Sequence, residues 1–180
     1  MELFNGRPDD FDSRLPREQR VYERLDELTI PYERVDHAPA ENMDVCREID
    51  KTLDARICKN LFLCNRQQTV FYLLMMPDDK PFKTKELSAQ IQSSRLSFAS
   101  PEKMLEFLDI LPGAVSIMGL MNDKDCRVNL LVDEDVLAGE YVGCHPCVNT
   151  SSLKIRTYDL FQTFLPSTNH SYTVVKLIGE

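Results

Sequence analysis

The segment Lys59-Asn60-Leu61-Phe62-Leu63 begins an apolar, β-prone part of the chain. Residues 61–64 and 69–76 are both apolar, and the polar stretch Asn65-Arg66-Gln67-Gln68 separates them. Two such runs joined by a short polar turn are typical of a β-hairpin. Lys59 therefore stands at the head of the first strand of a predicted hairpin.

Helical and strand signals surround this hairpin without a regular cadence. Helices are predicted over 15–28, around Val45-Ile49-Leu53, from a Thr84 cap, from Ser100-Pro101, over 133–137 and near 158–164, and strands over 127–132, 153–155 and 172–178. Ser100-Pro101 is the clearest helix start, because serine caps the first turn and proline fits the first helical position. The order lacks a repeated βαβ unit, so the predicted fold class is α/β of the α+β type, a mixed sheet with covering helices.

The composition is that of one folded domain. The chain has 180 residues, of which 43% are hydrophobic, within the usual range for a single domain with a core. No apolar run approaches the roughly 20 residues of a membrane span, and the first residues carry no secretory signal. We therefore expect a cytoplasmic protein with no membrane partner. Residues 1–12 are predicted to form a loose N-terminal tail and residues 13–180 the domain; monomer and homodimer both stay open.

The charge balance is acidic. Lys and Arg number 21 and Asp and Glu 29, a net charge of −8, whereas proteins that coat nucleic-acid duplexes usually carry a basic excess. A protein that grips only the end of an RNA needs a local positive patch instead. The densest candidates are Lys80, Lys83, Lys85 and Arg95, and a second set of Lys51, Arg56 and Lys59.

Two later loops complete a recognisable pattern with the Lys59 segment. The first is Pro112-Gly113-Ala114-Val115-Ser116, leading to Met121-Asn122-Asp123, and the second is Gly143-Cys144-His145-Pro146, closing on Asn149-Thr150. In order and spacing these segments resemble the prolyl-tRNA editing family, also called the YbaK or synthetase-insertion domain. The resemblance extends from about Val21 to Ile178. It is greatest to the freestanding branch that removes alanine from proline tRNA.

The resemblance implies a fold, an activity and a set of site residues. It implies a mixed sheet or partial barrel with covering helices, and a trans-editing hydrolase that deacylates mischarged tRNA, alanyl-tRNA(Pro) in the first place, at the acceptor end. The reaction would use water without a metal or other cofactor. Lys59 and His145 are the implied catalytic residues. The implied substrate-binding residues are Asn60, Gly113, Ala114, Val115, Ser116, Gly143, Pro146 and Asn149.

Ile117 departs from the family pattern, which has a proline at this position of the first loop. Proline would fix φ near −65° and bias Ser116 toward extended backbone, and isoleucine releases both restraints. Two alternatives therefore remain beside alanyl-tRNA(Pro): another aminoacyl-tRNA such as cysteinyl-tRNA(Pro), and a noncatalytic tRNA- or protein-binding module. A third alternative, a redox protein, has a separate origin.

The redox alternative comes from Cys144-His145-Pro146-Cys147, which matches a Cys-x-x-Cys motif. Redox motifs of this kind place the first thiolate at a helix N-terminus, whereas residues 148–155 predict a turn and a strand. The other cysteines supply no second Cys-x-x-Cys pair for zinc. His37 and Asp123 are interpreted as structural residues at a strand exit and in a turn.

Overall fold

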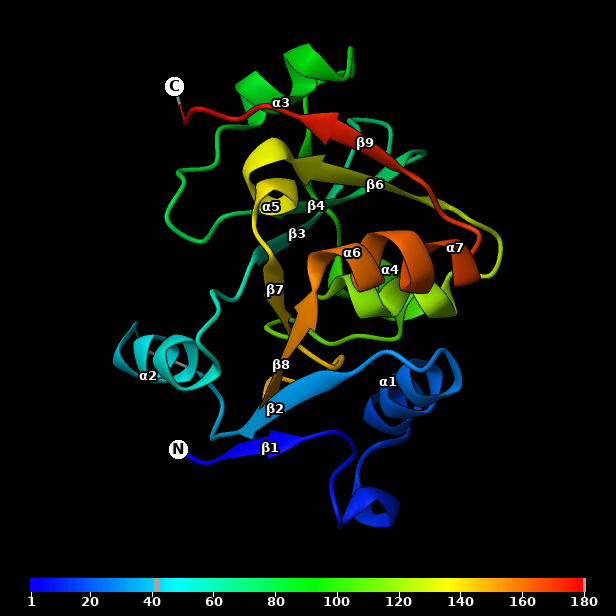
Figure 1. The fold of residues 1–180 in the computed structure, drawn as a ribbon. Coiled ribbons are helices and arrows are strands. Elements are labelled where there is room, and N and C mark those ends of the chain that lie inside the picture. Colours follow the sequence, from blue (N-terminus) through cyan, green and yellow to red (C-terminus); the bar gives the residue numbers. More distant parts are fainter. Residues whose placement is uncertain (41–42, 180) are drawn as a thin grey trace.

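The computed structural model describes residues 1–40 and 43–179 (Figure 1). Its strands form a four-stranded sheet of order β1-β2-β8-β7 and a five-stranded sheet of order β5-β3-β4-β6-β9. The strands are β1 (Leu3–Asn5), β2 (Tyr32–Asp36), β3 (Lys59–Cys64), β4 (Phe71–Met76), β5 (Ser97–Phe98), β6 (Val128–Asp133), β7 (Tyr141–Cys144), β8 (Ser151–Arg156) and β9 (Tyr172–Val175). The predicted class, mixed α/β with covering helices, is confirmed, but as two open sheets and not as one closed barrel.

The helices are distributed over both sheets. They are α1 (Pro16–Glu27), α2 (Met43–Leu53), α3 (Thr84–Gln90), α4 (Pro101–Leu108), α5 (Glu134–Ala138), α6 (Thr157–Asp159) and α7 (Leu165–Ser167), with 3-10 helices η1 (Phe11–Ser13) and η2 (Ile117–Asn122) and a π-helical segment η3 (Leu160–Phe164). Figure 1 shows α2 on one side of β7 and β8 and α6 on the opposite side. No helix within the described residues has the length and apolar content needed to cross a membrane.

The predicted hairpin is the centre of the five-stranded sheet. β3 pairs antiparallel with β4 from Lys59↔Met76 to Cys64↔Phe71. Asn65 stabilises the turn, because its Oδ1 accepts hydrogen bonds from the amides of Thr69 (2.8 Å) and Val70 (3.1 Å). β6 and β9 continue the sheet in parallel, so the sheet is mixed, as predicted.

The N-terminal segment differs from the prediction of a loose tail. β1 pairs antiparallel with β2, from Leu3↔Val35 to Asn5↔Glu33, and the guanidinium of Arg34 lies 4.7 Å from the centre of the Phe4 ring. The glycine and proline of this segment indicated irregular backbone. They follow the strand directly, at Gly6 and Pro8, and so mark its end.

Most helix predictions agree with the structure within a few residues. Ser100 caps α4, its Oγ accepting a hydrogen bond from the amide of Lys103 at 3.2 Å. Thr84 does not cap α3, since it is the first helical residue and Lys83 occupies the N-cap position. The helix predicted near 158–164 begins at Thr157 and passes into the π-helical segment, and β9 ends at Val175, before the predicted end at 178.

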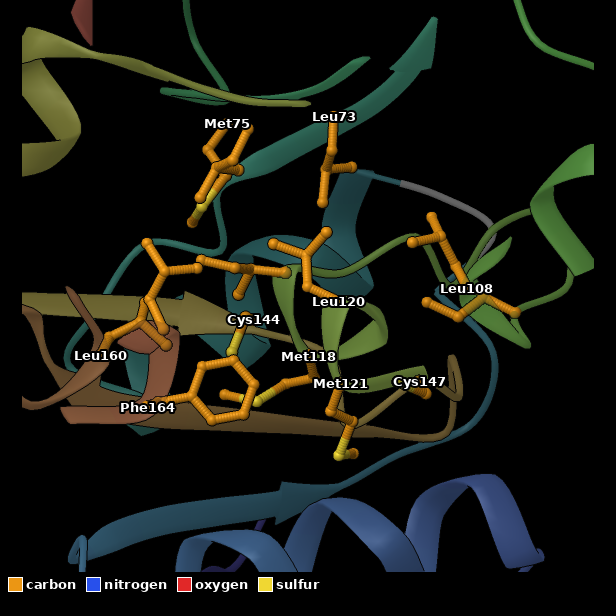
Figure 2. Packing of buried hydrophobic residues seen from close by; sticks show 14 of the residues in the cluster. Leu73, Met75, Leu108, Met118, Leu120, Met121, Cys144, Cys147, Leu160 and Phe164 are labelled. Carbon is orange, nitrogen blue, oxygen red and sulfur yellow. The ribbon is translucent and has the colours of Figure 1, made fainter. Parts of the chain in front are cut away.

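The strand alternation of β3 divides the hydrophobic interior. Phe62 belongs to the main core, which takes residues from both sheets, whereas Leu63 belongs to a second cluster that includes Leu87 of α3. A third cluster joins Val35 of β2 to Ile49 and Leu53 of α2. Figure 2 shows part of the main core, with Met118, Leu120 and Met121 of η2 among side chains of both sheets and of the C-terminal helical segment.

Candidate functional site

Lys59 projects away from the main core. Its neighbour Cys58 packs against the main core, and Leu61, which shares the side of β3 with Lys59, packs against the second cluster. The Lys59 ammonium donates a hydrogen bond of 2.8 Å to the carbonyl oxygen of Lys80. This bond fixes a partly buried lysine at the start of a strand, as the sequence predicted, and leaves two of its three donor hydrogens for other partners.

Gly143 connects the Lys59 strand to the His145 loop. The amide of Gly143 donates to the carbonyl of Arg56 at 3.1 Å, and its carbonyl accepts from the amide of Cys58 at 2.9 Å. A β-carbon at Gly143 would lie 2.5 Å from the Arg56 oxygen, so only glycine permits this approach. The structure explains Gly143 by packing; its predicted substrate contact stays a prediction.

Asn60 presents an unusual buried acceptor. Its Nδ2 donates to the carbonyl of Cys58 at 2.9 Å, and its Oδ1 is buried with no hydrogen-bond partner among the described residues. Because an unsatisfied buried acceptor costs roughly 1–3 kcal/mol, such a group is a candidate for binding a donor from a ligand. Asn60 follows Lys59 on β3, so the two side chains point to opposite sides of the strand. The substrate contact predicted for Asn60 stays a prediction.

His145 is held by the strand that follows it. Its Nδ1 lies 2.9 Å from the carbonyl oxygen of Ser151 and 3.4 Å from Oγ of Ser152. A carbonyl oxygen only accepts, so Nδ1 carries the hydrogen and Nε2 keeps a lone pair in the neutral ring. This is the tautomer that lets Nε2 accept a proton or a hydrogen bond from water.

His37 and Ser152 extend this arrangement. His37 Nδ1 lies 2.8 Å from the carbonyl of Ala38, and its Nε2 lies 2.8 Å from Ser152 Oγ. The centroids of the His37 and His145 rings are 6.2 Å apart. Burial lowers the pKa of His145; the hydrogen bond to Ser151 opposes this shift and the charge of His37 adds to it. His145 is therefore neutral at neutral pH.

The glycine-led loop lies beside the histidine loop. Gly113 has φ of 92°, in the left-handed region, and a β-carbon there would lie 3.7 Å from Nδ2 of Asn149. The structure thus brings the two predicted loops together at these residues. Ala114 belongs to the main core and Ser116 is fully buried. The Ser116 Oγ accepts a hydrogen bond from the Met118 amide at 3.2 Å, which caps η2.

Ile117 fills core space as the first residue of η2. Its side chain is 0% exposed and belongs to the main core. Ser116 before it has φ of −152° and ψ of 147°, the extended backbone that residues before proline also prefer. The loop therefore keeps a backbone compatible with the proline that it lacks.

The two motif cysteines are buried thiols. Cys144 and Cys147 both belong to the main core, and burial raises the pKa of each, that of Cys147 to about 12. Cys147 is followed by a turn and then β8, not by a helix. A reactive redox thiol needs the opposite shift. No group of three or more potential metal-ligating side chains occurs in the described part of the chain.

A partly buried polar network that includes Ser151 was not predicted from the sequence. Arg14 pairs with Glu18 (3.1 Å) and Asp36 (2.9 Å), and Ser151 donates its hydroxyl to Asp36. The spacing of four residues between Arg14 and Glu18 at the start of α1 was the one signal of this network in the sequence. Asp123, predicted to stabilise a turn, accepts the amides of Arg127 and Val128, and it also binds His170 at 2.9 Å.

Comparison with known proteins assigns this chain to a family. The family model described as the aminoacyl-tRNA editing domain matches residues 37–163, which include all the predicted site residues. The chain belongs to the aminoacyl-tRNA editing domain family.

Several individual proteins and structures are similar to this chain over most of its length. The prolyl-tRNA editing protein ProX of Acetoanaerobium sticklandii is 29% identical over 159 residues, covering 88% of this chain and 96% of that protein. The prolyl-tRNA synthetase associated domain-containing protein 1 of Danio rerio is 26% identical, over 87% of this chain and 85% of the relative. A crystal structure assigned as a candidate trans-editing enzyme for prolyl-tRNA synthetase matches with a TM-score of 0.68 at 17% identity, over 92% and 98% of the two chains. This last likeness shows the fold.

Proposed function

We propose that this protein is a trans-editing hydrolase that deacylates mischarged tRNA, with alanyl-tRNA(Pro) as its substrate. The observation that carries the proposal is the match of residues 37–163 to the aminoacyl-tRNA editing domain, because this stretch contains Lys59, the Gly113 loop and the His145 loop. The name of the ProX relative, a prolyl-tRNA editing protein, supports proline tRNA as the partner.

Lys59 orients the acceptor end in this proposal. Its ammonium is anchored by the Lys80 carbonyl and keeps further donor capacity. A fixed cation attracts the phosphate and ribose oxygens of the terminal nucleotide, and a lysine on a strand is held more rigidly than one on a mobile loop. The ester carbon is thereby presented to water in a constant position.

His145 and the Gly113 loop serve the attack of water. The Nε2 lone pair of His145 accepts a hydrogen bond from the attacking water, and the terminal ribose hydroxyl assists. Backbone amides of the Gly113 loop stabilise the developing oxyanion without reorganisation. A small amino-acid pocket admits alanine and excludes proline by size, as in double-sieve editing. The proposed reaction uses no metal.

A deacylation assay with tRNA(Pro) charged with alanine, cysteine, serine or proline tests the proposal. Alanyl-tRNA(Pro) is expected to be hydrolysed fastest and prolyl-tRNA(Pro) least, with and without a chelator. Fastest hydrolysis of the cysteinyl ester would move the specificity to cysteine. Binding of tRNA(Pro) with no hydrolysis of any ester would contradict the enzymatic proposal, and loss of activity with chelator would contradict the metal-free chemistry.

A further inference from the structure

A shallow cavity of about 540 Å³ opens at Lys59, on the side of the five-stranded sheet that carries α3. Its lining combines two aromatic rings, Phe82 and Phe98, with three cations, Lys59, Lys83 and Lys85. The chain as a whole is acidic, so three lysines at one cavity are a local exception.

Phe98 is a large aromatic residue that lies outside the core and is exposed. It stands on the short edge strand β5 opposite Leu63 and is 63% exposed. Its ring lies 6.3 Å from that of Phe82 in an edge-to-face arrangement. Phe98 is thus part of an aromatic pair at a cavity, and contiguous exposed apolar groups, unlike single ones, mark contact sites.

Two of the lysines at this cavity are not neutralised by a neighbouring acidic residue within the described residues. Lys80 nearby is held by Asp133 and Asp135, whereas Lys83 and Lys85 are exposed and have no acidic partner within the described residues. The adjacent carboxylate of Glu86 accepts the amides of Ile178 and Gly179. The cavity therefore presents net positive charge beside aromatic faces.

We propose that this cavity binds the unpaired 3′-terminal nucleotides of a tRNA, with a base stacked on Phe98 and the backbone phosphates beside Lys83 and Lys85. Aromatic platforms with flanking cations are how proteins hold single-stranded nucleic acid, and a base inside a duplex already has both faces stacked on its neighbours. The inference rests on the proposed function. It extends the site from Lys59 to Lys83 and Lys85, which the charge pattern indicated, and to Phe82 and Phe98, which no sequence signal indicated.

The test measures binding of uncharged RNA, which does not depend on hydrolysis. The probe is a fluorescently labelled single-stranded RNA ending in CCA, followed by anisotropy, with a blunt duplex of the same sequence as competitor. Phe98→Ala is expected to weaken binding roughly tenfold or more, as removal of a stacking platform does. The double change Lys83→Ala with Lys85→Ala is expected to reduce the slope of log affinity against log salt by about 1.4, or about 0.7 for each phosphate that the protein no longer neutralises.

Tyr158→Ala is the matched control, because Tyr158 is 69% exposed and lines a different cavity. Binding by Phe98→Ala at the parent affinity, an equal loss in Tyr158→Ala, competition by the duplex as strong as by the single strand, or no binding by the parent would each overturn the inference. A parent that binds through Phe98 but hydrolyses no ester contradicts the proposed function and leaves this inference standing. If the parent hydrolyses esters and Phe98→Ala binds RNA normally, the proposed function stands and this inference is contradicted.

Discussion

The amide of Cys58 donates a hydrogen bond of 2.9 Å to the carbonyl oxygen of Gly143. Cys58 precedes Lys59, and Gly143 lies two residues before His145. This one bond therefore sets the start of β3 against the end of β7, and it positions the two residues proposed to carry the reaction relative to each other across two different sheets.

Gly143→Ala is expected to destabilise the fold and disturb the site together. The new β-carbon would lie 2.5 Å from the Arg56 oxygen, and overpacking of this kind costs about 1–3 kcal/mol. Urea unfolding measures the loss. Gly139→Ala is the control, since its β-carbon would be no closer than 3.5 Å to its neighbours, and its stability is expected within about 0.5 kcal/mol of the parent. Equal stabilities of the two variants would show that the close approach is not required.

His145 is expected to make stability and activity depend on pH below neutrality. Its folded-state pKa lies below the ordinary 6.5, so on acidification the unfolded chain binds the proton first. The free energy of unfolding should fall as pH drops below 6.5, and level off below the folded-state pKa. Deacylation should fall in the same direction as Nε2 becomes protonated. Urea titrations at several pH values compare the parent with His145→Gln, and a parent slope no steeper than that of the variant would contradict this assignment.

Ile117→Pro is expected to change stability by less than about 1 kcal/mol. Proline at a compatible position stabilises by about 0.4–1 kcal/mol through the unfolded state, and Ser116 already has the extended backbone that proline favours. The fully buried isoleucine loses packing, at a cost of about 0.5–1.5 kcal/mol by analogy with Ile→Val. Ile117→Val separates the two effects. Ester preference should be unchanged, and a shift among alanine, serine and cysteine esters would mean that Ile117 shapes the pocket.

Replacement of both motif cysteines is expected to preserve most of the deacylation rate. Burial raises the pKa of Cys144 and Cys147, so neither supplies a thiolate. Cys144→Ala with Cys147→Ala avoids placing serine hydroxyls in the core. Rates are compared with and without reductant, after thermal unfolding has shown that the variant is folded. A folded double variant that has lost activity would contradict this prediction and would indicate that one of the thiols takes part in the reaction.

Local sequence signals were sufficient for the hairpin and several helices. Polar residues 65–68 between two apolar runs predicted the β3–β4 hairpin, and the Ser100-Pro101 pair predicted the start of α4, because both signals act between neighbours. The order of strands in the two sheets depends on distant pairings, such as that of residues 56–58 with Gly143, which no local pattern encodes. β1 was missed for the same reason, since a three-residue strand is stabilised by β2 and not by its own sequence.

The sequence indicated candidate site residues but not their geometry. The motifs marked Lys59 and His145, and the resemblance gave them roles. The tautomer of His145 depends on Ser151 and the serine that follows it, six and seven residues downstream of His145, and the anchor of Lys59 is a backbone carbonyl at Lys80. Neither partner has a distinctive side-chain pattern in the sequence.

The most direct test of the central claim is the rate at which Lys59→Ala deacylates alanyl-tRNA(Pro). Loss of a charged hydrogen-bond donor that acts on the substrate costs about 1.5–3 kcal/mol, so the rate is expected to fall roughly tenfold to a hundredfold. Unfolding by urea should show little change, because the Lys59 side chain is outside the main core. Lys124→Ala, at an exposed turn, is expected to keep the parent rate. A folded Lys59→Ala variant that hydrolyses alanyl-tRNA(Pro) as fast as the parent would contradict the account.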